Sequence, residues 1–195
     1  MFAGHFGLAA AVKAKEKDVP VWALMLGTQL LDVIFVPLYL SGVETIVPVG
    51  GMGYGSGLIH ADYSHSLVGA AIISLIYGYI GRRAWGKRAG TVLGLVTFSH
   101  WLLDLIVHRP DLPILPGNLG SLPLLGFGLW RHPAVSAWLE GIMIAAGFLL
   151  YFRSALARSR NARSGAGGKS KKWAYISSAA MGVLLLSSLL TDTMG

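Results

Sequence analysis

Residues 89–107 read AGTVLGLVTFSHWLLDLIV, and this stretch decides the fold class. A transmembrane helix needs about 20 mainly apolar residues, because each residue advances about 1.5 Å through a hydrocarbon core about 30 Å thick. The stretch has that length, and its only ionisable side chains are His100 and Asp104. It therefore predicts a membrane-spanning helix that carries two polar groups inside the bilayer.

Apolar stretches of similar length occur before and after this one. Of the 195 residues, 54% are hydrophobic and only 13% are charged, against about 25% charged in soluble domains. We predict an all-α, polytopic membrane helical bundle of about five transmembrane helices, forming a single domain over residues 1–195. The other spans are expected at residues 20–40, 65–81, 134–152 and 173–190. Residues 2–12 are apolar but too short to cross, so we expect an N-terminal half-helix over residues 2–14.

The connecting segments have distinct compositions. Residues 41–64 are rich in glycine and are predicted to form a loop. Their glycine-dense part, residues 50–57, follows no strand pattern and precedes no Lys-Ser/Thr pair, so we do not read it as a phosphate-binding loop. Residues 109–133 hold five prolines among apolar residues and are expected in or near the membrane interface. Residues 153–172 are basic and rich in Gly and Ser, which predicts a flexible linker.

The positive charge is confined to the ends of the predicted spans. The net charge is +7, and fourteen of the sixteen Lys and Arg residues fall within residues 13–17, 82–88 and 153–172. The positive-inside rule places all three clusters in the cytoplasm, next to anionic lipid headgroups. Membrane lipids are therefore the expected partners, and nucleic acid is not.

Five residues are candidate metal ligands. Ionisable side chains inside a span are costly and are functional candidates by default. Asp32 lies in the first span, His65 opens the second, and His100 and Asp104 share one face of the third because they are four residues apart. An i, i+4 His–Asp hydrogen bond would look the same in sequence. His5 joins the group only if the half-helix turns inward rather than lying on the membrane surface.

Other polar residues could complete such a site. His60 and His108 are additional ligand candidates, and Asp62 and Glu140 are candidate catalytic acids or bases. Ser64 is expected to cap the helix that follows it. The chain has no cysteine, so a metal would be held by imidazole and carboxylate groups, which suit zinc, manganese or iron.

The order of these residues resembles that of YdjM-type inner-membrane metal-dependent hydrolases. The similarity covers about residues 1–108 and rests on four motifs, namely Gly4-His5, Leu31-Asp32, His60 with Ser64-His65-Ser66, and Ser99-His100 with Asp104. A looser similarity links the ligand order to zinc-dependent phospholipase C. The resemblance implies a divalent metal, with zinc as the first expectation, and a location in the bacterial inner (cytoplasmic) membrane.

The sequence also departs from the family pattern. Val33 and Ile34 follow Asp32 where the family usually has a second acid and a histidine. Ala61 and Asp62 stand where it usually has Arg-Gly. These departures could mean fewer metal ions, a changed substrate or no catalysis.

Three functional hypotheses follow. The first is a membrane-embedded metal-dependent hydrolase acting on a lipid-like or amphiphilic (phospho)ester, where the ester class rests on family analogy. The second is a non-catalytic membrane subunit of a larger protein complex, packed through small residues such as Gly141 and Gly147, with a structural His/Asp site. A transporter is the third, although no inverted repeat is evident.

The metal hypothesis makes a geometric prediction. Two ligands of one metal lie at most about 4.5 Å apart, so one or two ions would gather all five candidates within about 8 Å. Asp32 should contact His100 or His5, because a lone aspartate in the bilayer is costly.

Overall fold

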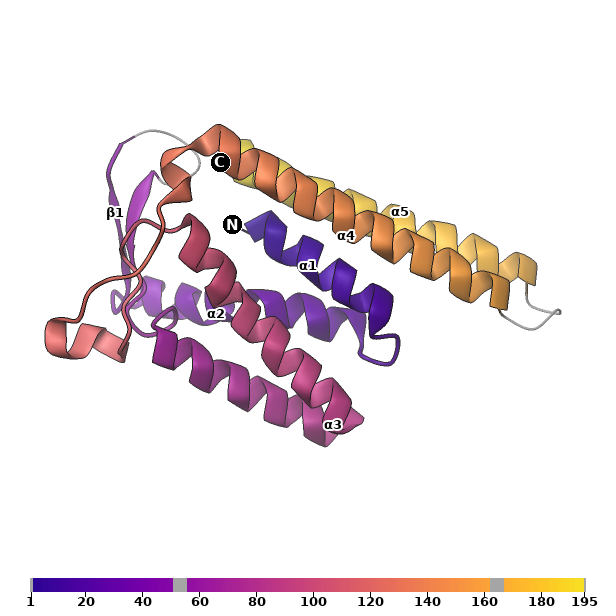
Figure 1. Cartoon of the computed structure of the whole chain (residues 1–195), viewed down its shortest axis with the longest axis horizontal. Coiled ribbons are helices and arrows are strands. Elements are labelled where there is room, and N and C mark those ends of the chain that lie inside the picture. Colours follow the sequence, from indigo (N-terminus) through magenta and orange to yellow (C-terminus); the bar gives the residue numbers. More distant parts are fainter. Residues whose placement is uncertain (1, 51–55, 162–166, 195) are drawn as a thin grey trace.

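Helices make up almost the whole fold (Figure 1). The computed structural model describes residues 2–50, 56–161 and 167–194. Its α-helices are α1 (Phe2–Lys15), α2 (Val21–Leu40), α3 (Leu67–Val107), α4 (Pro133–Asn161) and α5 (Gly167–Met194). A two-stranded antiparallel hairpin, β1 (Thr45–Pro48) and β2 (Gly57–His60), and two 3₁₀ turns, η1 (Pro116–Ser121) and η2 (Leu129–Arg131), complete the described part.

Four of these helices have the length and composition of membrane spans. They are α2, α3, residues 133–160 of α4 and residues 170–193 of α5. The chain is an integral membrane protein, and the predicted all-α helical bundle is confirmed. The predicted spans 65–81 and 89–107 are joined in α3, a helix of 41 residues that begins at Leu67, two residues after the predicted start. Figure 1 shows why, because α3 folds back on itself as two arms that lie side by side.

Glycines make the fold of α3 possible. Gly86, at the bend, has φ of 89°, a left-handed conformation that side chains other than hydrogen disfavour. Beyond the bend the arms approach backbone to backbone. A Cβ added at Gly78 would lie 3.0 Å from the carbonyl oxygen of Gly90, and one at Gly94 would lie 3.2 Å from that of Ser74. Small residues allow such close contact between helices in a membrane.

The short N-terminal helix α1 lies inside the bundle. It packs against α4 and also contacts α2 and α5. Ala3, His5, Ala9 and Ala10 are each at most 1% exposed. At its start, the backbone N–H of Ala3 donates to the carboxylate of Asp192 in α5 at 2.8 Å. The half-helix prediction is confirmed, and the alternative of a helix on the membrane surface is excluded.

The predicted basic clusters gather at one end of the bundle. Figure 1 shows the end of α1, the bend of α3, the end of α4 and the start of α5 on the same side of the molecule. Arg88 beside the α3 bend donates to Glu16 after α1 at 2.9 and 3.0 Å. Ser154 of α4 donates to the carbonyl oxygen of Ala14 at 2.7 Å. This "basic end" lies opposite the β-hairpin.

Two connections differ from their predictions. Residues 41–64 contain the β1–β2 hairpin, in which Thr45 pairs with His60 and Pro48 with Gly57. β-branched residues at 45–47 favour this extended pairing over a simple loop. The segment 153–172, predicted as a flexible linker, is helical as far as Asn161 and again from Gly167. Its Ala, Arg and Lys residues are good helix formers, which explains why the helices continue beyond the apolar stretches. Residues 51–55 and 162–166 lie outside the described residues.

Candidate metal centre

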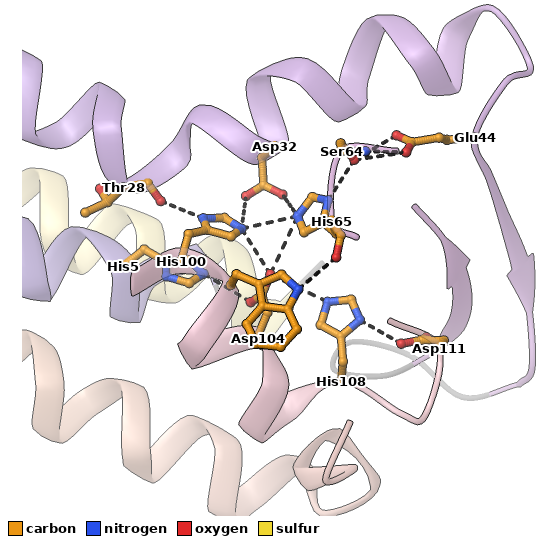
Figure 2. A network of polar contacts seen from close by, with 11 residues as sticks. His5, Thr28, Asp32, Glu44, Ser64, His65, His100, Asp104, His108 and Asp111 are labelled. Atoms are coloured by element: carbon orange, nitrogen blue, oxygen red, sulfur yellow. Dashed lines mark hydrogen bonds and ion pairs between the residues drawn. The ribbon is translucent and has the colours of Figure 1, made fainter. Parts of the chain in front are cut away.

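The five predicted ligands converge at the end of the bundle next to the hairpin (Figure 2). The carboxylate of Asp104 lies between two imidazoles, with Oδ1 3.2 Å from His5 Nε2 and Oδ2 3.0 Å from His100 Nε2. Asp32 faces the same place from α2, with Oδ1 3.4 Å from His65 Nε2 and Oδ2 3.7 Å from His100 Nε2. The Nε2 atoms of His65 and His100 are 3.3 Å apart. The five residues thus form a single cluster, as predicted. Asp32 lies beside His100, one of its two expected partners, and beside His65 rather than His5.

Two overlapping triads have the spacing of metal ligands. They are His5, His100 and Asp104, and Asp32, His65 and His100. Within each triad the ligand atoms lie within 4.8 Å of one another, close to the limit of about 4.5 Å for two ligands of one ion. His100 belongs to both, and it is fully buried. These buried His and Asp groups could hold a metal ion.

Hydrogen bonds fix the tautomer of His100 and His65. Nδ1 of His100 lies 2.6 Å from the backbone oxygen of Thr28, which can only accept, so Nδ1 carries the proton. Nδ1 of His65 lies 2.8 Å from Oγ of Ser64. The single hydroxyl proton of Ser64 goes to the carboxylate of Glu44 at 2.8 Å, so Oγ accepts from His65. In their neutral forms both imidazoles therefore present Nε2 lone pairs to the cluster.

This arrangement concentrates hydrogen-bond acceptors. When His65 and His100 are neutral, their two Nε2 lone pairs face the carboxylates of Asp32 and Asp104, and none of these four groups donates to another. Such a set of atoms repels itself unless it takes up protons or a cation. Imidazoles whose Nδ1 donates to a carbonyl or hydroxyl and whose Nε2 faces the site are typical metal ligands. The residues present therefore fit a divalent ion.

A second layer of residues orients His65. The buried carboxylate of Glu44 accepts hydrogen bonds from the backbone N–H groups of Tyr63 and Ser64, both at 2.8 Å. Trp101 donates from Nε1 to the backbone oxygen of His65 at 2.9 Å. The sequence did not single out Glu44, because an acid in a glycine-rich connection carries no spacing signal. The contribution of Trp101, one residue after His100, also could not be read from spacing.

His108 lies beside the triads and on the wall of a cavity. Its Nε2 is 3.8 Å from Oδ2 of Asp104, and its Nδ1 is 2.9 Å from Oδ1 of Asp111. The other carboxylate oxygen of Asp111 accepts from the backbone N–H of Ile59 in β2 at 3.1 Å. The cavity has a volume of about 280 Å³ and is lined by Asp32, Phe35, Val36, Ile59, His65, Asp104, His108 and Trp130. The His-x-x-Asp spacing of His108 and Asp111 was a signal that could have identified this pair.

The other predicted residues lie elsewhere. His60 pairs with Thr45 in the hairpin and belongs to neither triad. Asp62 is half-buried in the turn before α3, and Glu140 is fully buried in α4. The described residues that line the cavity include neither of them, so their catalytic role stays a prediction.

The helix cap predicted at Ser64 is wrong. The N-cap of α3 is Ser66, whose Oγ accepts from the N–H of Gly69 at 3.1 Å. Ser64 is two residues too early for that geometry. Its hydroxyl connects Glu44 to His65 instead.

Comparison with known proteins gives no relative. No family model, curated protein or solved structure gives a significant match to this chain. The resemblance to YdjM-type hydrolases therefore stays an expectation, and functional inference rests on the geometry of the cluster and its cavity.

Proposed function

We propose that the chain is a membrane-embedded metal-dependent hydrolase that acts on an amphiphilic ester, with a phosphoester as the first substrate class. The observation that carries the proposal is the pair of overlapping His/Asp triads that opens on a cavity. A divalent ion in such a site, with zinc as the first expectation, would supply Lewis-acid activation of water and of the ester. His5, Asp32, His65, His100 and Asp104 are the residues proposed to hold it.

The cavity suits the polar part of an amphiphile. Asp32, whose side chain is 33% exposed, forms part of its wall together with His65 and Asp104. Phe35, Val36 and the other apolar lining residues would contact the apolar part of the substrate next to its headgroup. A volume of about 280 Å³ is at the small end for ligand pockets, which matches a headgroup rather than a whole lipid.

A proton acceptor is also available at the cavity wall. His108 lies outside both triads, and Asp111 orients it by a hydrogen bond to Nδ1, so that a neutral His108 offers Nε2 as a base. Asp62 and Glu140 are the acceptors expected from sequence. Neither is among the described residues that line the cavity. His108 is therefore the first residue to test in this role.

The membrane orientation follows from charge. If the basic end faces the cytoplasm, as the positive-inside rule requires, the cluster and its cavity lie in the outer half of the membrane. The substrate would then enter from the outer leaflet.

The test combines metal analysis with an activity assay. The protein would be purified in mild detergent without a metal-affinity tag, analysed for metals by mass spectrometry, and assayed with fluorogenic phosphodiester and carboxylester amphiphiles. We expect about one or two divalent ions per chain and hydrolysis that His100→Ala abolishes along with the metal. His60→Ala, a histidine outside both triads, is the control and should retain both. A native protein without metal, whose properties His100→Ala leaves unchanged, would refute the proposal.

Burial of the cluster favours a second candidate function. His5, His100 and Asp104 are each at most 2% exposed, as in closed structural metal sites. In this case the chain would be a non-catalytic subunit whose metal joins α1, α2 and α3. Bound metal, no hydrolysis of either ester class and stoichiometric copurification with other membrane proteins would establish this function instead.

A further inference from the structure

A second hollow lies on α3, away from the metal cluster. It has a volume of about 510 Å³ and runs between the two arms of the helix. Gly78, Gly90 and Gly94 contribute no side chains to it, so the arms form a furrow where they meet. Leu75 and Leu95 line it and are 74% and 66% exposed, so the furrow opens on the outer surface of the helices, where lipid is expected.

The furrow is mainly apolar, with three hydroxyl-bearing residues (Ser74, Tyr79 and Thr91) in its lining, and it is basic at one end. Arg82 and Lys87, on either side of the bend, line that end, and both are exposed. None of the described residues that line the furrow is acidic. An anionic group held there would meet two cations without a competing carboxylate.

The length of the furrow matches one leaflet. Its lining residues on the first arm extend from Ala71 to Arg82, eleven helical steps or about 16 Å. Half of a hydrocarbon core about 30 Å thick is about 15 Å. A lipid whose phosphate lies at the basic end would therefore place its acyl chain along the glycines as far as the middle of the membrane.

We propose that this furrow binds one anionic phospholipid from the leaflet at the basic end. Its phosphate lies against Arg82 and Lys87, and one acyl chain occupies the space above Gly78, Gly90 and Gly94. A second copy of this chain fits less well. A twofold axis along the membrane normal would bring the same ends together and place like charges in contact. The proposal does not depend on metal binding or hydrolysis.

The experiment measures lipid retention by native mass spectrometry of the full chain released from detergent micelles. Delipidated protein would be offered phosphatidylglycerol or phosphatidylcholine with matched acyl chains. We expect each chain to retain one phosphatidylglycerol molecule tightly and to bind phosphatidylcholine more weakly. Removing both cations in Arg82→Gln/Lys87→Gln should weaken phosphatidylglycerol binding about 25-fold, or about fivefold for each charge.

Matched controls separate the site from general attraction to a basic surface. Arg83→Gln removes a neighbouring exposed charge that does not line the furrow, and it should leave binding unchanged. Ala71→Phe, which fills the apolar end of the furrow, should weaken binding of both lipids while the helical circular dichroism is retained. Inorganic phosphate should not compete, because it has no acyl chain.

Three results would overturn the proposal. One is equal retention of the two lipids. Another is a loss of phosphatidylglycerol binding in Arg83→Gln that equals the loss in Arg82→Gln/Lys87→Gln. The third is a dimer whose formation depends on Arg82 and Lys87 and that carries no lipid, which would assign the furrow to a second copy of the chain.

Discussion

The backbone of Gly7 in α1 lies directly against the backbone of Gly147 in α4, with no side chain between them. A Cβ at Gly147 would collide with the carbonyl oxygen of Gly7, and one at Gly7 would lie 2.8 Å from the carbonyl oxygen of Met143. His5 is two residues from this crossing and stacks on His100 with ring centroids 3.9 Å apart. The crossing therefore sets the position from which the first helix contributes its imidazole.

Gly147→Leu should remove His5 from the cluster without altering any proposed ligand. The added side chain would push α1 away from α4, and we expect metal affinity to fall at least about tenfold, as for residues that position ligands. Competition with a chromophoric chelator measures this change. Gly141→Leu is the control, since a Cβ at Gly141 meets nothing within 4 Å. An equal loss in both variants would show that the crossing has no special role.

Glu44→Gln should weaken metal binding although Glu44 is not a proposed ligand. When the amide oxygen keeps the two backbone hydrogen bonds, an NH2 group replaces the oxygen that accepts from Ser64. This group donates rather than accepts, so Ser64 no longer fixes the Nδ1 proton of His65. Outer-shell changes of this kind cost about 10–100-fold in affinity. Glu16→Gln makes the same charge change at the basic end and should leave affinity unchanged. Wild-type affinity in Glu44→Gln would contradict this account of His65.

Asp32→Ala should affect metal retention rather than membrane insertion. An aspartate in a span adds about 2.5–3.5 kcal/mol to the cost of insertion, so its removal should make insertion easier. The same change deletes one member of the second triad. Protein in the membrane fraction and metal per purified chain are the two measurements. Loss of protein from the membrane with the metal content intact would reverse the expectation.

The ion pair between Glu16 and Arg88 should give a small pH-dependent stability. Hydrogen bonds from Arg88 lower the pKa of Glu16 below its ordinary value near 4.5. The folded chain thus holds this proton less tightly than the unfolded chain. The pair therefore stabilises the fold above the ordinary pKa, and the effect is lost as the pH falls through the lowered value.

Arg88→Gln should lower Tm by no more than about 3 °C at neutral pH, because Arg88 is exposed. The difference from wild type should vanish in acid, and a Tm difference that grows as the pH falls would be inconsistent with the pair.

Membrane orientation can be tested by labelling single cysteines, because the chain has none of its own. Leu119→Cys, at an exposed site in η1, should react with an impermeant maleimide added to intact cells. Arg160→Cys, exposed near the end of α4, should react only after permeabilisation. The opposite pattern would place the basic end outside.

Sequence alone could predict the spans and the polar residues on them that form the cluster. Hydropathy located each membrane helix, and the cost of burying charge singled out Asp32, His100 and Asp104 before any geometry was known. The inward turn of α1 was left open, because a hydrophobic half-helix can satisfy its apolar side chains on the membrane surface as well as in a bundle. The deciding feature is the contact between Gly7 and Gly147, a pairing of small residues 140 positions apart that no local pattern reveals.

The residues that orient His65 were harder to predict, because they too act through contacts between distant parts of the chain. Glu44 acts through a hydrogen bond to Ser64, twenty residues away, and the register of the hairpin decides that contact. Hairpin formation itself was missed, because glycine richness in residues 41–64 masked the strand-forming residues at 45–47.

The bond between Ala3 and Asp192 has a consequence for biosynthesis. The helix α1, which carries His5, is synthesised before α4 and α5, the helices that hold its start and its middle in place. A nascent chain that has produced α3 already contains His65, His100 and Asp104 and offers α1 its contacts with α2, but it lacks α4, the helix against which α1 mainly packs. Completion of the cluster is therefore expected to follow insertion of α4 and α5, so the full set of His and Asp groups comes together only after those two helices have been made.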